Sequence, residues 1–179
     1  MPIVAGDILL KLSVKTGSAG NSTAGTPAGS LGKYISTTAI SGTALNNIFD
    51  DITGDENAAS EAEYRCIFVH NNHATLTLLS PVCWISAETG GGAAAAISVD
   101  TTAASAVGNS SAQAKEVVDE NTAPATQTFS APTTKGTGLA LGDIPAGQVK
   151  AIWIRRTAAN TAAVDNDGFS LSVAGDTAA

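Results

Sequence analysis

Charge is scarce in this sequence of 179 residues. Only 14% of the residues are Asp, Glu, Lys or Arg, whereas about 25% is usual in globular proteins. Acids outnumber bases by 16 to 9, which gives a net charge of −7. Nucleic-acid binding needs a basic surface, so this balance argues against a direct nucleic-acid partner. A chain with so little repelling charge is better tolerated when it packs against other copies.

Long apolar runs are also missing. No stretch approaches the roughly 20 residues that cross a bilayer. The first 15 residues are interrupted by Asp7 and Lys11, unlike a secretory signal. We therefore expect a chain made in the cytoplasm, with no membrane partner. Its two cysteines, Cys66 and Cys83, are too few for a disulfide framework and are expected to be buried thiols.

Large side chains are few, because Ala, Gly, Ser and Thr dominate whole segments, so most large residues should lie in the core. In "FSLSV", Phe169, Leu171 and Val173 alternate with serines, as in a half-buried strand. Around Trp153 both faces are apolar, which predicts a strand covered on both sides. We expect strands at residues 7–15, 64–72, 74–86, 93–99, 149–154 and 169–173, with shorter extended pieces at 115–120, 126–132 and 138–141.

Short strands between turn signals predict an all-β fold, an antiparallel β-sandwich of Ig-like or jelly-roll-like type. The strands at 64–72 and 74–86 are expected to form a hairpin through "NNHA". One short helix is predicted near 43–53, where apolar residues recur at helical spacing. Its apolar face would contain Leu45, Ile48, Phe49 and Ile52.

The segment 16–33 is rich in Gly, Ser and Thr and has no periodicity. A long segment of this kind is typical of a loop or an extended arm. We therefore predict two parts, an N-terminal strand and extended arm at 1–40 and a β-sandwich domain at 41–179. The arm is expected to become ordered against a neighbouring subunit.

All the cysteines and histidines of the chain lie within eighteen residues, at Cys66, His70, His73 and Cys83. Four such ligands could hold zinc. In the expected hairpin, however, Cys83 lies roughly four residues, or about 13 Å, beyond the position that faces Cys66. We therefore predict two buried thiols and two histidines near a turn, with no metal. A Cys–His hydrolase would also need an orienting acid, and no G-x-S-x-G motif is present.

Two acidic clusters were weighed as calcium sites. The first contains Asp50, Asp51, Asp55 and Glu56, and the second contains Asp165, Asn166 and Asp167. The second lacks the glutamate that closes an EF-hand loop, and Asx-rich turns are common without metal. The Gly-rich segment 89–96 lacks the Lys-Ser/Thr of a P-loop. We therefore predict no catalytic, cofactor-binding or metal-binding residues, and a protein that is not an enzyme.

Arg155 and Arg156 end the strand that contains Trp153 and should point to opposite faces. Two interpretations remain open. The pair is either a solvated strand end, or one arginine pairs with an acidic residue at a subunit interface, where arginine is enriched.

Several segments together resemble a family of tailed-bacteriophage virion structural proteins. The most specific are "EYRCIFVHN", "DIPAGQ" with "WIRRT", and the closing "NDGFSLSVAGDT", within a resemblance that covers about residues 45–177. It implies a structural protein of the head or tail of the virion, assembled in the host cytoplasm. The compact sandwich with an extended N-terminal arm favours a capsid decoration or cement protein, because such a protein must reach several capsid subunits at once. Its partners would be the major capsid protein and other copies of itself, as a homotrimer. The alternatives are a tail, neck or fibre component or, less favoured, a carbohydrate-binding β-sandwich module.

Overall fold

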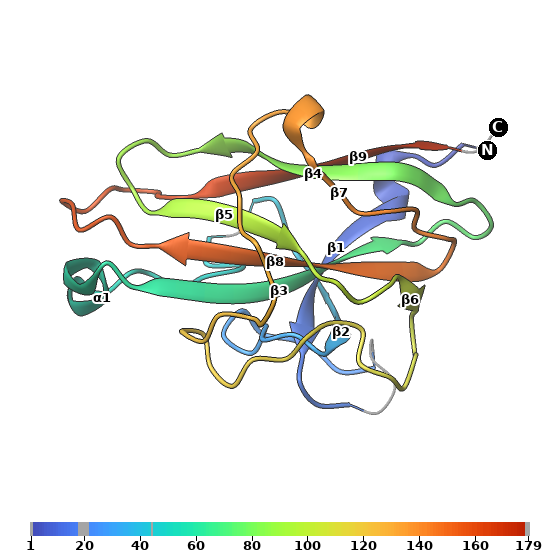
Figure 1. Ribbon diagram of the computed structural model, residues 1–179, viewed down its shortest axis with the longest axis horizontal. Coiled ribbons are helices and arrows are strands. Elements are labelled where there is room, and N and C mark those ends of the chain that lie inside the picture. The colour runs from blue at the N-terminus through green and yellow to red at the C-terminus, as the bar shows by residue number, and fades with distance from the viewer. Residues whose placement is uncertain (1, 18–21, 44, 178–179) are drawn as a thin grey trace.

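Two antiparallel sheets packed face to face form the protein (Figure 1). The computed structural model describes residues 2–17, 22–43 and 45–177. The large sheet has six strands in the order β2-β1-β3-β8-β5, with β6 also paired to β8, and the small sheet has the order β7-β4-β9. The predicted antiparallel β-sandwich is therefore confirmed.

The elements have the following bounds. The large sheet contains β1 (Ile8–Val14), β2 (Tyr34–Ala39), β3 (Ala62–Asn71), β5 (Ala94–Val99), β6 (Ser105–Ala106) and β8 (Gln148–Thr157). The small sheet contains β4 (Leu78–Glu88), β7 (Leu139–Ala140) and β9 (Phe169–Thr177). One α-helix, α1 (Gly54–Ala59), and two 3-10 turns, η1 (Ala5–Asp7) and η2 (Lys135–Thr137), complete the described elements.

Two apolar cores lie on opposite faces of the large sheet. The first fills the space between the sheets and includes Ile152 and Ile154 of β8. The second lies on the outer face and includes Ala151 and Trp153 of the same strand. Loop residues such as Val117 cover this outer core. The predicted two-sided burial of β8 therefore arises from a sheet on one side and a layer of loops on the other.

The predicted hairpin at "NNHA" is wrong, because β3 belongs to the large sheet and β4 to the small one. The chain crosses between the layers here. Asn71 is fully buried at the crossing, and its side-chain amide donates to the carbonyls of Leu76 and Ile144. These bonds fix a wide connection instead of a tight turn.

The helix lies later in the chain than predicted. Residues 45–49 form turns and bends, residues 50–53 have no regular structure, and Asn46 has a φ of 54°, which interrupts a right-handed helix. Phe49 packs into the inner core while Leu45 is 76% exposed, so the apolar residues do not share one face. The helix begins after Thr53, whose side chain accepts the Glu56 N–H. Residue 44, within the predicted range, lies outside the described residues.

The N-terminal segment is an integral part of the sandwich. Strand β1 lies between β2 and β3, so residues 8–14 and 34–39 contribute strands to the same sheet as β3, β5 and β8. The described residues of the predicted arm run along strand edges of this sheet. The Cys66 N–H donates to the Ser30 carbonyl at 2.7 Å, and the Thr37 N–H donates to the Thr23 carbonyl. Residues 18–21 of the predicted arm lie outside the described part of the chain.

Candidate functional site

The four residues weighed as zinc ligands are not brought together. Cys66 lies in the outer core and Cys83 in the inner core, so the large sheet separates them. His73 caps a turn, because its Nδ1 accepts the N–H groups of Thr75 and Leu76. Across the described residues, no group of three or more His, Cys, Asp or Glu side chains is arranged to hold a metal ion.

Both thiols are buried and unpaired. Burial raises the pKa of Cys83 to about 12 and raises the pKa of Cys66 well above its usual value, with a smaller contribution from Asp100. A nucleophilic cysteine needs the opposite shift. Burial, aided by Lys11, also lowers the pKa of His70.

Three residues of the two acidic clusters have structural contacts. Glu56 completes the cap of α1 by accepting the Thr53 N–H. The Asp167 carboxylate accepts the Ala93 N–H at 2.7 Å and so joins two loops. Asp50 forms ion pairs with two arginines.

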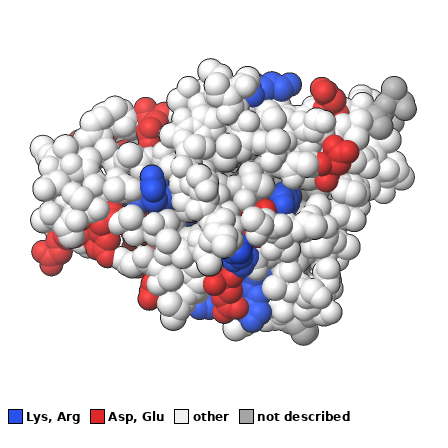
Figure 2. All heavy atoms as spheres, in the orientation of Figure 1, with Lys and Arg blue, Asp and Glu red and all other residues white. Residues whose placement is uncertain are grey.

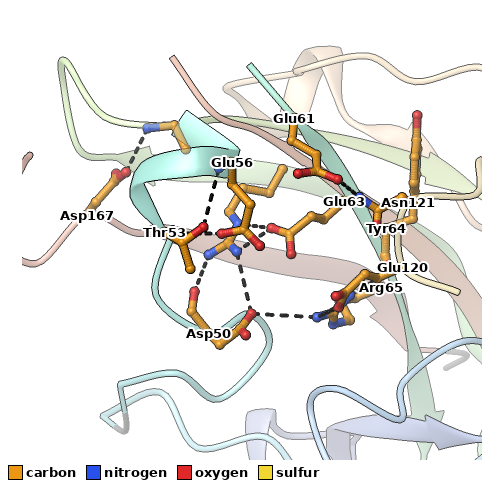
Figure 3. Close-up of polar contacts among 12 residues, drawn as sticks. Asp50, Thr53, Glu56, Glu61, Glu63, Tyr64, Arg65, Glu120, Asn121 and Asp167 are labelled. Atoms are coloured by element: carbon orange, nitrogen blue, oxygen red, sulfur yellow. Dashed lines mark hydrogen bonds and ion pairs between the residues drawn. The ribbon is translucent and has the colours of Figure 1, made fainter. Parts of the chain in front are cut away.

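An ion-pair cluster lies at the end of the sandwich beside α1 (Figure 3). Arg65, whose side chain is 1% exposed, pairs with Glu120 from the loop layer. Arg156 pairs with Glu63 of β3. The Asp50 carboxylate lies between the two arginines, 3.7 Å from Arg65 and 3.6 Å from Arg156. We call these five residues the end cluster.

The end cluster joins four segments of the chain. It ties β3, β8, the loop containing Asp50 and the loop containing Glu120 to one another. The guanidinium groups of Arg65 and Arg156 also lie 5.2 and 4.7 Å from the centre of the Phe49 ring. Burial raises the pKa of Glu63 even though Arg156 opposes the shift. Each of the five charged side chains forms an ion pair within the chain. The end cluster therefore holds these segments together.

The adjacent arginines therefore match neither sequence interpretation in full. They do point to opposite faces. Arg156 has its acidic partner, Glu63, in the same chain, and the Arg155 guanidinium lies 5.5 Å from the Phe129 ring of the loop layer.

A second polar centre fastens the loop layer to the outer face of β8. The Asp100 carboxylate accepts hydrogen bonds from the Trp153 indole at 2.8 Å and from the Lys115 and Thr102 N–H groups. Burial alone would raise the pKa of Asp100, but these hydrogen bonds lower it. Lys150 adds a hydrogen bond to the Asp100 carbonyl.

These two centres were missed by the sequence analysis. The partners Asp100 and Trp153 are 53 residues apart, and Arg65 and Glu120 are 55 apart. One signal was available. Arg65 directly precedes the apolar run at 66–69, and a charge inside a buried strand requires a partner.

A shallow groove of about 270 Å³ lies between β5 and β7. Its lining is made of hydroxyl, amide and aliphatic groups, namely Ser98, Val99, Thr101, Thr126, Gln127, Thr128, Leu139 and Ala140. The lining contains no acid, base or thiol, and no aromatic ring for stacking against a sugar. The side chain of Trp153 is fully buried elsewhere.

The edges of the sheets are the remaining candidate surface. The outer edge of β2 is capped by the Thr23 carbonyl and by the Gln113 side chain, which accepts the Ile35 N–H. The outer edge of β5 is capped by reciprocal hydrogen bonds between Ile97 and Ser130. Strand β9 pairs with β4 on one side only. Among the described residues, no backbone hydrogen bond caps its other side.

Comparison with protein-family models, curated proteins and solved structures finds no match for this chain. Within the described residues, no helix is both long and apolar enough to cross a membrane.

Proposed function

We propose that this chain is a non-enzymatic structural subunit of a tailed-bacteriophage particle, and that it decorates the head shell by binding the major capsid protein. The observation that carries the proposal is a surface suited to packing against protein. Among the described residues, that surface has few charged side chains. It also includes the long outer edge of β9, to which no backbone hydrogen bond is made.

The surface is poor in charge because the chain uses its cations internally. Figure 2 shows scattered acidic and basic residues on a mostly uncharged face, without a large patch of one sign. Arg65 and Arg156 belong to the end cluster, and Lys15 and Lys33 pair with Glu116. A surface with few charged groups lowers the free-energy cost of removing water when many copies pack closely.

The resemblance of the segments at 63–71, 143–148, 153–157 and 166–177 to phage virion structural proteins supports a place in a phage particle. In the structure these segments form parts of β3, β8 and β9 and the turn before β8. These segments therefore build the framework of the sandwich. A resemblance in framework strands supports the proposal of a structural subunit.

A binding experiment tests the proposal. Purified protein is mixed separately with isolated heads and isolated tails from particles that lack it, and each mixture is sedimented. We expect the protein to sediment with heads at a saturable ratio to the major capsid protein. Binding only to tails would replace the proposal with the tail or neck alternative, and binding to neither would overturn the structural role.

A further inference from the structure

Strand β9 is the long edge that the described residues leave open. It has nine residues, Phe169–Thr177, whereas the other edges are either capped by loops or, as in β6 and β7, only two residues long. An open edge presents unpaired N–H and C=O groups, which is a template for another strand.

The usual protections against such pairing are missing from β9. Natural edges are blunted by lysine, proline or bulges, and the sequence "FSLSVAGDT" contains neither lysine nor proline. Both irregularities in the pairing of β4 with β9 place the extra residue in β4, between Leu79 and Val82 and between Ile85 and Ala87. Strand β9 itself is regular along its length.

The direction of the open main-chain groups follows from the hydrogen bonds on the paired side. The carbonyls of Gly168 and Ser170 are directed towards β4, where they accept from Thr89 and Ser86. Because main-chain groups alternate along a strand, the groups of Leu171, Val173 and Gly175 point to the open side.

Among the described residues, the one long edge that can pair with β9 is β9 of a second copy. The edges of β2 and β5 already have their hydrogen bonds from Thr23, Gln113 and Ser130. A strand-exchanging trimer needs a head-to-tail contact, in which β9 of one copy pairs with a different edge of the next. Within the described part of the chain, no second long edge is free to make that contact. The remaining pairing is of β9 with β9 of a second copy, about a twofold axis.

We propose that two copies of the chain pair antiparallel through β9, with Val173 on the twofold axis. This joins the two small sheets into one continuous six-stranded sheet.

The sequence of β9 is self-complementary in that register. Leu171 faces Gly175 of the second copy, so the larger side chain lies opposite the residue without one. Asp176, the single charge of the strand, faces Ser170 and not another carboxylate. Like charges directly opposite would be unfavourable, and this register avoids them.

A contact made by one strand edge is small, and interfaces below about 1,200 Å² in total are usually weak. We therefore expect a concentration-dependent dimer in solution, which becomes stable when many copies are held on one surface.

The full chain is tested by sedimentation equilibrium from micromolar to millimolar concentration. We expect the mass to rise from 17.8 kDa towards twice that value. Val173→Pro removes an N–H on the open side and should remain monomeric. Ser172→Asp brings like charges together near the axis, because it lies diagonally beside residue 172 and Asp176 of the second copy, and should weaken the dimer at least tenfold. Thr133→Asp, which adds the same charge on an exposed loop, should dimerise as the unmodified chain does.

Circular dichroism of each variant confirms folding, and if Val173→Pro does not fold, Ser172→Asp decides the question. A chain that stays monomeric at millimolar concentration, or a Ser172→Asp variant that dimerises normally, would overturn the proposal. The register is read from oxidation of single-cysteine variants made in a Cys66→Ala, Cys83→Ala chain, because Cys83 lies opposite Val173 within one copy and would compete for the disulfide. Val173→Cys should form a disulfide-linked dimer and Leu171→Cys should not, and the reverse result would overturn the register.

The inference rests on the proposed assembly role but is measured on purified protein. Failure to dimerise and failure to bind heads are therefore separate outcomes.

Discussion

At the scale of single residues, Trp153 shows what the sequence reveals and what it does not. Its apolar neighbours predicted a buried position, and the side chain is fully buried. Its hydrogen-bond partner, Asp100, could not be predicted, because no local pattern connects residues 53 positions apart. The indole is both core filler and one of the donors that hold the loop layer on the sheet.

Replacing Trp153 tests both roles. Trp153→Ala should lower the free energy of unfolding by about 3–5 kcal/mol, the usual cost of removing a buried large aromatic. Trp153→Phe keeps a ring but leaves the Asp100 carboxylate with one donor fewer, so a loss of about 1–3 kcal/mol is expected. Urea denaturation measures both values. An unchanged midpoint in Trp153→Ala would contradict the buried position.

The buried thiols give the stability a dependence on alkaline pH. The pKa of Cys83 is raised from 9.0 to about 12 in the folded chain. As the pH rises, the unfolded chain therefore loses this proton before the folded chain does. The contribution of the protonated thiol to stability is complete below pH 9 and is lost as the pH rises from 9 to about 12. We expect the free energy of unfolding to fall less steeply above pH 9 in Cys83→Ala. Identical slopes in the two proteins would contradict the raised pKa.

At the scale of elements, local alternation was enough to predict most strands but not their partners. The segments at 64–72 and 74–86 do overlap β3 and β4, yet the strands belong to different sheets. A short polar linker looks the same whether it closes a hairpin or crosses between layers. The difference lies in the buried Asn71 side chain and its bond to Ile144, 73 residues away. Such contacts leave no trace in a local pattern.

The end cluster is the contact that joins β3, β8 and two loops, and it can be tested by a double-mutant cycle. Arg156→Met leaves the buried Glu63 carboxylate without its main partner, which should cost about 3–5 kcal/mol. The double variant Glu63→Gln, Arg156→Met removes that uncompensated charge and should recover much of the loss. Urea midpoints of the four proteins give the coupling. Equal losses in the single and double variants would show that the pair does not act together.

At the scale of the whole molecule, the chain closes most of its surfaces on itself. The loop layer covers the outer face of the large sheet, internal ion pairs use most of the arginines, and loops cap the edges of β2 and β5. What remains is a surface with little charge and the open edge of β9. These are properties of a subunit that functions by being packed, and they support the proposed place on a phage head.

The most direct test of this account is the location of the protein in the particle. Electron microscopy would compare intact phage particles with particles that lack the chain, and a difference map would show where density is lost. We predict lost density on the outer surface of the head, repeated over the shell. Density lost only at the tail or neck, or no lost density at all, would contradict the account.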